Sequence, residues 1–172
     1  MNEPLAFKPR PSTGQLWLFG IGIALLVLIL GPSLLAVLSA PEALPSLVIG
    51  LLVGLVLGGV FIAMGLWVPA MRYELDDQYL TLRCGPLLNY RIPIAGIQGI
   101  RRRNLALSLW SSMRFPGIAM WDVRYADEGR VYMCATSALT GILLIETEKE
   151  KYGITPADEE AFVAALKARM PA

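Results

Sequence analysis

LWLFGIGIALLVLILGPSLLAVL, residues 16–38, is followed by a second apolar run, LVIGLLVGLVLGGVFIAMGLWVPA, residues 47–70. Glu42 is the only charged residue between Leu16 and Ala70. A hydrocarbon core of roughly 30 Å needs about 20 apolar residues in a helix, and each run meets that length. The intervening residues 39–46, SAPEALPS, have the prolines and the carboxylate of a polar turn. The sequence therefore predicts a transmembrane helical hairpin over residues 15–70.

Two other interpretations compete with a membrane hairpin. A buried hairpin in a soluble protein would carry a polar face, and neither run has one. A cleaved signal peptide with Lys8 and Arg10 as its basic region would be shorter, and a second span would not follow at once. We therefore expect the protein to be solvated by the lipid bilayer, as an integral protein of the cell (inner) membrane.

Basic residues predict the orientation of the hairpin. Lys8 and Arg10 precede it, Arg72, Arg83 and Arg91 follow it, and the turn has no Lys or Arg. By the positive-inside rule, both termini lie in the cytoplasm. Residues 1–14 then form a short, flexible cytoplasmic tail, and residues 71–172 form a cytoplasmic domain.

Glycines at intervals of four mark one face of the second span. Gly50, Gly54 and Gly58 allow another helix backbone to approach closely. We expect the partner to be the first span, which is already tethered. The alternative is self-association or contact with another chain through the same face.

Composition limits the chemistry that the chain can perform. Its 172 residues contain no histidine, which excludes imidazole as a base or ligand, and the net charge is +1. So small a charge argues against nucleic-acid binding through bulk electrostatics. Cys84 and Cys134 would stay reduced in the cytoplasm and make a poor zinc site on their own. We expect no metal, no cofactor and no catalytic residues.

After residue 71 the hydrophobic period becomes that of strands. About seven or eight short strands are predicted up to residue 154, with Asp127-Glu-Gly129 as one hairpin turn. This spacing is typical of an antiparallel barrel or sandwich. A final helix is predicted with Thr155 as its N-cap and an apolar stripe that includes Phe162 and Leu166, which should plug an open end or seam.

A run of strands followed by one amphipathic helix is similar to pleckstrin-homology-like (PH-like) domains. Short motifs over roughly Tyr73 to Met170 resemble the bacterial PH-domain membrane proteins: Ile92-Pro-Ile94, Pro116-Gly117, Gly129-Arg-Val-Tyr, Ala135-Thr136, Leu143-Leu-Ile-Glu-Thr147 and Tyr152-Gly-Ile-Thr-Pro156. The resemblance implies a mainly-β PH-like barrel closed by the C-terminal α-helix. It implies no enzymatic activity and carries no functional residues over to this chain.

The connection over residues 103–120 is the main candidate site, because long connections in small domains are usually functional or disordered. It combines apolar residues with the only dense basic run. The candidate binding residues are Arg101, Arg102, Arg103, Trp110, Arg114 and Phe115. Anionic headgroups or a protein partner would fit such a surface. The alternative is a solvated strand end beside an ordinary core-covering loop.

The sequence thus predicts a membrane-anchored PH-like binding or scaffold module that presents its barrel and loop 103–120 to a protein partner or to anionic lipid. The alternative is an accessory or assembly subunit of a membrane complex, packed through the glycine face of the second span. An enzyme is not expected, since no glycine-rich phosphate loop is present and the reactive side chains follow no paired motif.

Overall fold

Two compact units make up the computed structural model, which describes residues 4–40, 42, 44–106 and 114–170. Residues up to Gly14 and from Trp67 onward form one unit, the β domain. Gln15–Leu66 form the other unit, the helical hairpin. The β domain is therefore built from both flanks of the hairpin.

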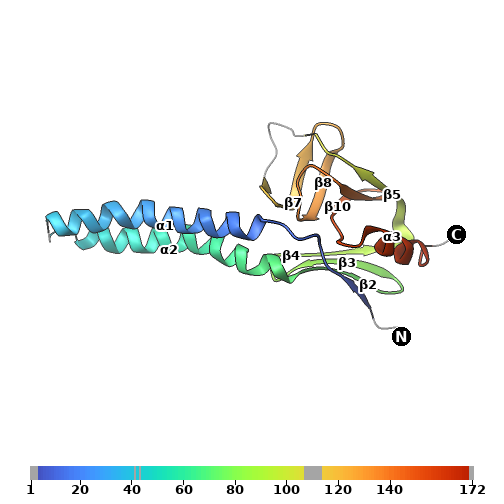
Figure 1. Cartoon of the computed structure of the whole chain (residues 1–172), viewed down its shortest axis with the longest axis horizontal. Helices are drawn as coiled ribbons and strands as arrows, with labels where there is room; N and C mark the ends of the chain where they lie inside the picture. Colours follow the sequence, from blue (N-terminus) through green and yellow to red (C-terminus); the bar gives the residue numbers. More distant parts are fainter. Residues whose placement is uncertain (1–3, 41, 43, 107–113, 171–172) are drawn as a thin grey trace. The chain divides into compact units, whose positions relative to one another are not determined.

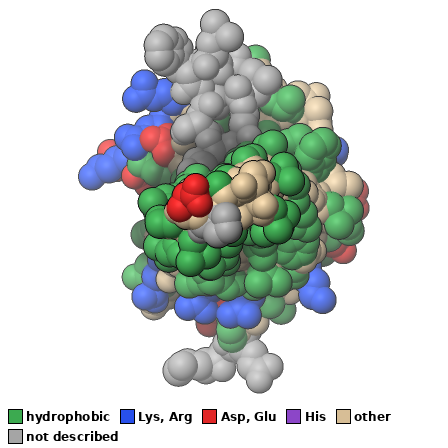
Figure 2. Space-filling view, turned by 90° about the vertical axis from the view of Figure 1, so that its left-hand side faces the viewer, with side chains coloured by type: hydrophobic (Ala, Val, Ile, Leu, Met, Phe, Trp, Pro, Cys, Tyr) green, Lys and Arg blue, Asp and Glu red, His purple; other side chains and the backbone are tan. Residues whose placement is uncertain are grey.

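The hairpin consists of α1 (Gly14–Ser39) and α2 (Leu44–Trp67), both long and apolar enough to cross a membrane. Most of their large side chains are exposed, and Figure 2 shows hydrophobic side chains around the end of the hairpin that faces the viewer. The helices match the predicted spans closely. α2 ends at Trp67 rather than residue 70 because Val68–Ala70 form a 3-10 turn, η2, which contains Pro69.

The three spaced glycines of α2 are buried against α1. A Cβ atom on Gly58 would lie 2.8 Å from the carbonyl oxygen of Gly22, and one on Gly50 would lie 2.5 Å from Ser33 Oγ. At Gly54 the nearest atom, Leu26 Cδ2, would be 3.5 Å away, an ordinary contact. The glycine face of α2 is thus covered by α1 of the same chain.

We predict that Gly58→Ala destabilises the hairpin, because its methyl group would collide with backbone and force the helices apart. Gly59→Ala is the matched control, since nothing lies within 4 Å of a Cβ at that position. Thermal unfolding of the full-length protein in mild detergent should show a lower midpoint for Gly58→Ala alone. Equal midpoints for the two variants would contradict the observed helix packing.

Two sheets form the β domain (Figure 1). The first has four strands in the order β1 (Leu5–Phe7), β2 (Met71–Leu75), β3 (Tyr79–Cys84) and β4 (Leu88–Pro93). A 3-10 turn, η3 (Ile94–Gly96), leads to the second sheet. That sheet has the order β5 (Ile97–Arg103), β9 (Ile142–Thr147), β10 (Lys151–Ile154), β8 (Gly129–Ala135), β7 (Ile118–Tyr125) and β6 (Arg114–Phe115).

The strand positions follow the sequence predictions, but their arrangement differs. The two sheets do not close into the expected barrel. The pairing is also not wholly antiparallel, because β10 lies between β9 and β8 and runs parallel to β8. Residues 136–141 join β8 to β9, and β10 fills the gap between these two strands. The hairpin turn at residues 127–129 is confirmed, with Gly129 at a φ of 72°.

The first strand corrects the prediction of a flexible tail. β1 precedes the hairpin and β2 follows it, yet they pair antiparallel, with Leu5 opposite Leu75 and Phe7 opposite Tyr73. The prediction failed because a strand of three residues is too short to show an alternating hydrophobic pattern.

Arg10 continues this attachment beyond β1. Its backbone N–H donates to the Thr155 carbonyl at 2.8 Å, and its guanidinium donates to the Gly141 carbonyl at 2.8 Å and to Glu159 at 3.1 Å. Ala157 N–H donates to the Lys8 carbonyl at 2.9 Å. The segment before α1 is therefore an ordered part of the β domain.

The C-terminal helix α3 (Glu159–Lys167) packs inside the domain. Phe162 and Leu166 are fully buried, and the Phe162 ring lies edge-on to Phe7 at 5.2 Å and to Tyr73 at 6.2 Å. The predicted apolar stripe is thus confirmed at Phe162 and Leu166, which the helix buries on the β1–β2 side of the core.

The predicted cap of this helix is wrong. Asp158 is the N-cap, and its carboxylate accepts from Ala161 N–H at 2.9 Å. The Thr155 hydroxyl is buried instead and accepts from Thr136 N–H at 2.8 Å. Thr155 therefore satisfies the backbone of a neighbouring strand end rather than a helix terminus.

Both cysteines are buried as free thiols in the core. Burial raises the pKa of Cys84 to about 11 and raises that of Cys134 well above its usual value. Because the thiolate is the reactive form, we expect both thiols to react slowly, since they stay protonated and are packed in the core.

We predict that a maleimide reagent leaves both thiols unmodified in the folded protein at about pH 8, where only about one thiol in a thousand with such a pKa is ionised. Unfolding in urea should expose both. Lys149→Cys, at an exposed turn, provides the positive control. If native Cys84 reacts as fast as that control, the buried core is incorrect.

Candidate functional site

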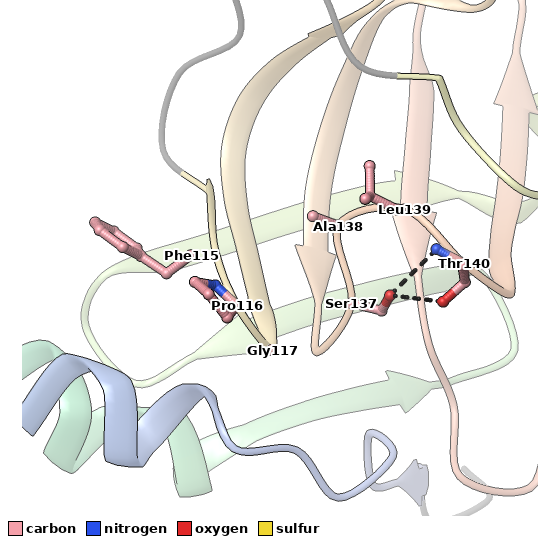
Figure 3. A pocket seen from close by; sticks show the side chains of 7 residues that line it. All are labelled: Phe115, Pro116, Gly117, Ser137, Ala138, Leu139 and Thr140. Atoms are coloured by element: carbon pink, nitrogen blue, oxygen red, sulfur yellow. Dashed lines mark hydrogen bonds between the residues drawn. The ribbon is translucent and has the colours of Figure 1, made fainter.

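An open pocket of about 450 Å³ lies between two loops of the β domain (Figure 3). The turn between β6 and β7 supplies Phe115, Pro116 and Gly117. The loop between β8 and β9 supplies Ser137, Ala138, Leu139 and Thr140. We call this the Phe115 pocket.

The first wall is held by the segment that leads into α1. Gly117 has a φ of 81°, which only glycine adopts easily, and a Cβ there would lie 2.6 Å from Gly14 N. Ser12 Oγ donates to the Gly117 carbonyl at 2.6 Å. The Pro116-Gly117 turn is thus attached to the last residues before the hairpin.

The second wall is held by hydrogen bonds to its backbone. Leu105 N–H donates to the Leu139 carbonyl at 2.7 Å, and Tyr125 Oη donates to the Ala138 carbonyl at 2.7 Å. Within the loop, Ser137 Oγ accepts from Thr140 N–H at 3.3 Å, as drawn in Figure 3. Both walls are therefore formed before any ligand arrives.

The residues labelled in Figure 3 are mostly apolar, and Ser137 and Thr140 add two hydroxyl groups. None of the described residues that line the pocket is ionisable, so these residues supply no acid, base or charged nucleophile. Among the described residues, no group of three His, Cys, Asp or Glu side chains is arranged to hold a metal. An apolar group fits this lining.

Arg101, Arg102 and Arg103 lie elsewhere, on β5 at the edge of the six-stranded sheet. Each has an acidic partner: Arg101 hydrogen-bonds to Glu146, Arg102 lies 3.8 Å from Glu159, and Arg103 lies 3.8 Å from Glu128. The hydrogen bond to Glu146 also raises the pKa of Arg101. Side chains alternate along a strand, so Arg102 points to the opposite face from the other two.

Of the predicted site residues, Phe115 alone is brought to the pocket. Trp110 lies outside the described residues, and only the backbone of Arg114, in β6, is described. Sequence reasoning missed the wall at residues 137–140. A Ser and a Thr three residues apart before Gly141 indicate a tight loop, but only the fold sets it opposite the β6–β7 turn.

Comparison with known proteins yields one family. The sequence model of the bacterial PH domain matches residues 71–170, more than half of the chain's 172 residues. No curated protein and no solved structure gives a significant match. The match covers nine of the ten described strands and α3, and it begins immediately after η2. Two apolar helices lie before the matched residues, and the match shows that the chain belongs to the bacterial PH-domain family.

Proposed function

We propose that the chain is an integral protein of the inner membrane whose β domain is a non-catalytic binding module on the cytoplasmic side. Two long apolar helices support the membrane placement. The pairing of β1 with β2 supports two crossings, because a hairpin that leaves and re-enters one folded domain has both ends on one side. Basic residues on both flanks and none in the turn favour the cytoplasm for that side.

The proposed ligand is an apolar side chain of a protein partner, seated in the Phe115 pocket. The observation that carries this proposal is the preformed apolar pocket, whose walls are fixed by internal hydrogen bonds. Binding to such a site does not require the loops to be ordered first, and that saves conformational entropy.

A peptide suits the site better than a lipid chain because of the adjoining strand. β6 is the last strand of its sheet among the described strands. A peptide can extend along a strand at the edge of a sheet, whereas a hydrocarbon chain cannot. The arginines of β5 add little to an anionic-lipid interpretation of this region, because each faces a carboxylate.

We predict that a photo-crosslinking amino acid at Phe115 captures a protein in intact membranes, giving an adduct heavier than the chain itself. The same amino acid at Lys149, on the exposed β9–β10 turn, is the matched control and should give none. Leu139→Asp should abolish the adduct from position 115, because a carboxylate in the apolar lining is poorly solvated.

The mass of the adduct decides between the possible ligands. An adduct containing only lipid, or no adduct at all, would contradict a protein ligand at this pocket. An adduct that persists in Leu139→Asp would mean that the captured partner binds outside the pocket.

A further inference from the structure

The outward face of the four-stranded sheet carries a row of polar side chains that the proposed pocket does not use. Arg72 on β2 is paired directly with Arg83 on β3, which is paired with Asn89 on β4. The three residues line a hollow of about 460 Å³ together with Ala70, Gly85 and Pro86. Two guanidinium groups and an amide thus lie side by side across three strands.

This row has more positive charge than the protein neutralises. Arg72 Nε lies 2.7 Å from one oxygen of Glu74, and Arg83 Nη1 lies 3.5 Å from the other. One carboxylate is therefore shared by two cations, whose side chains are 53% and 42% exposed. Like charges directly opposite each other weaken a sheet, and a bound anion would relieve the repulsion. Glu128 and Glu159 near β5 are likewise each shared by two cations, but those cations are not register partners across a strand pair.

The row of Arg72, Arg83 and Asn89 begins a few residues after the end of α2. Met71 begins β2 immediately after η2, so Arg72 is only five residues beyond Trp67, within about 17 Å along the chain. The β3–β4 turn returns to the same point: Cys84 Sγ lies 3.6 Å from the Trp67 carbonyl, and a Cβ on Gly85 would be 3.1 Å from the Trp67 ring. A tryptophan at the end of a span is typical of the headgroup level of a bilayer.

We propose that Arg72, Arg83 and Asn89 bind the phosphate of an anionic phospholipid headgroup. The inference rests on the proposed membrane placement of the hairpin but not on the Phe115 pocket. Guanidinium groups donate paired hydrogen bonds to phosphate oxygens, and the Asn89 amide adds a neutral donor. A soluble phosphate offers the same chemistry, but a site so near the end of a membrane span meets lipid headgroups first.

The test uses the full-length protein in nanodiscs, with phosphatidylglycerol titrated into phosphatidylcholine and bound lipid measured by native mass spectrometry. Arg72→Gln with Arg83→Gln should lower the affinity for phosphatidylglycerol roughly 30-fold, about 2 kcal/mol for two cations near the surface. Removing two facing like charges should leave the fold intact, and protection of Cys84 from maleimide checks this.

The chain provides a matched control in Arg124 and Arg130. They also face each other across paired strands, and Arg130 also has a carboxylate, Asp122, at 2.7 Å. Ile118 lies beside the turn that contacts Gly14, and Arg124 lies about 20 Å farther along β7. Arg124→Gln with Arg130→Gln should therefore retain wild-type binding. An equal loss of phosphatidylglycerol affinity in both double variants would show a general effect of charge and would overturn the site.

Two further arms separate the remaining outcomes. If inorganic phosphate displaces phosphatidylglycerol from the wild type at comparable concentration, the site binds free phosphate, and the proposed lipid ligand is wrong. If the double variant does not fold, Asn89→Asp, which places a carboxylate in the row, should still lower affinity, and unchanged binding would overturn the site. Release of the protein from membranes by alkaline carbonate would instead refute the membrane placement itself.

Discussion

The backbone pairing of β1 with β2 is the interaction on which the rest of the structure depends. It joins a strand that ends before the hairpin to a strand that begins after it. The Arg10 hydrogen bonds to Thr155, Gly141 and Glu159 extend the same attachment to the C-terminal part of the domain. As a result, the apolar hairpin is an insertion within one folded domain, and both of its ends emerge from that domain.

One structured turn of the β domain contacts the residues just before the hairpin, and another contacts the last residue of α2. The β6–β7 turn contacts Ser12 and Gly14 before α1, and the β3–β4 turn contacts Trp67 at the end of α2. Each loop borders one of the proposed sites: the Phe115 pocket borders the first, and the arginine row borders the second. Both proposed sites therefore lie beside residues of the β domain that are adjacent to the hairpin in the sequence.

Sequence patterns with a strong physical signal were reliable predictors here. Two long apolar runs located α1 and α2, alternation located most strands, and the stripe through Phe162 located the buried side of α3. Short or non-local features were not predictable. β1 is too short to show an alternating pattern. β10 pairs parallel with β8, which is distant in the sequence, and the N-cap of α3 is Asp158 rather than Thr155. The acidic partners of Arg101–Arg103 come from distant elements, so the sequence could not show that each arginine lies near a carboxylate.

Disulfide trapping across β1 and β2 tests this account most directly. Ala6 and Glu74 are register partners, so Ala6→Cys with Glu74→Cys should oxidise rapidly within one chain. The measurement uses membranes washed with alkaline carbonate and returned to neutral pH, with Ala6→Cys and Lys149→Cys as the control pair. We expect fast intramolecular crosslinking of the first pair only, in protein that stays in the washed membranes. Protein lost in the wash, or crosslinking no faster than that of the control pair, would contradict a β domain assembled from both flanks of a membrane hairpin.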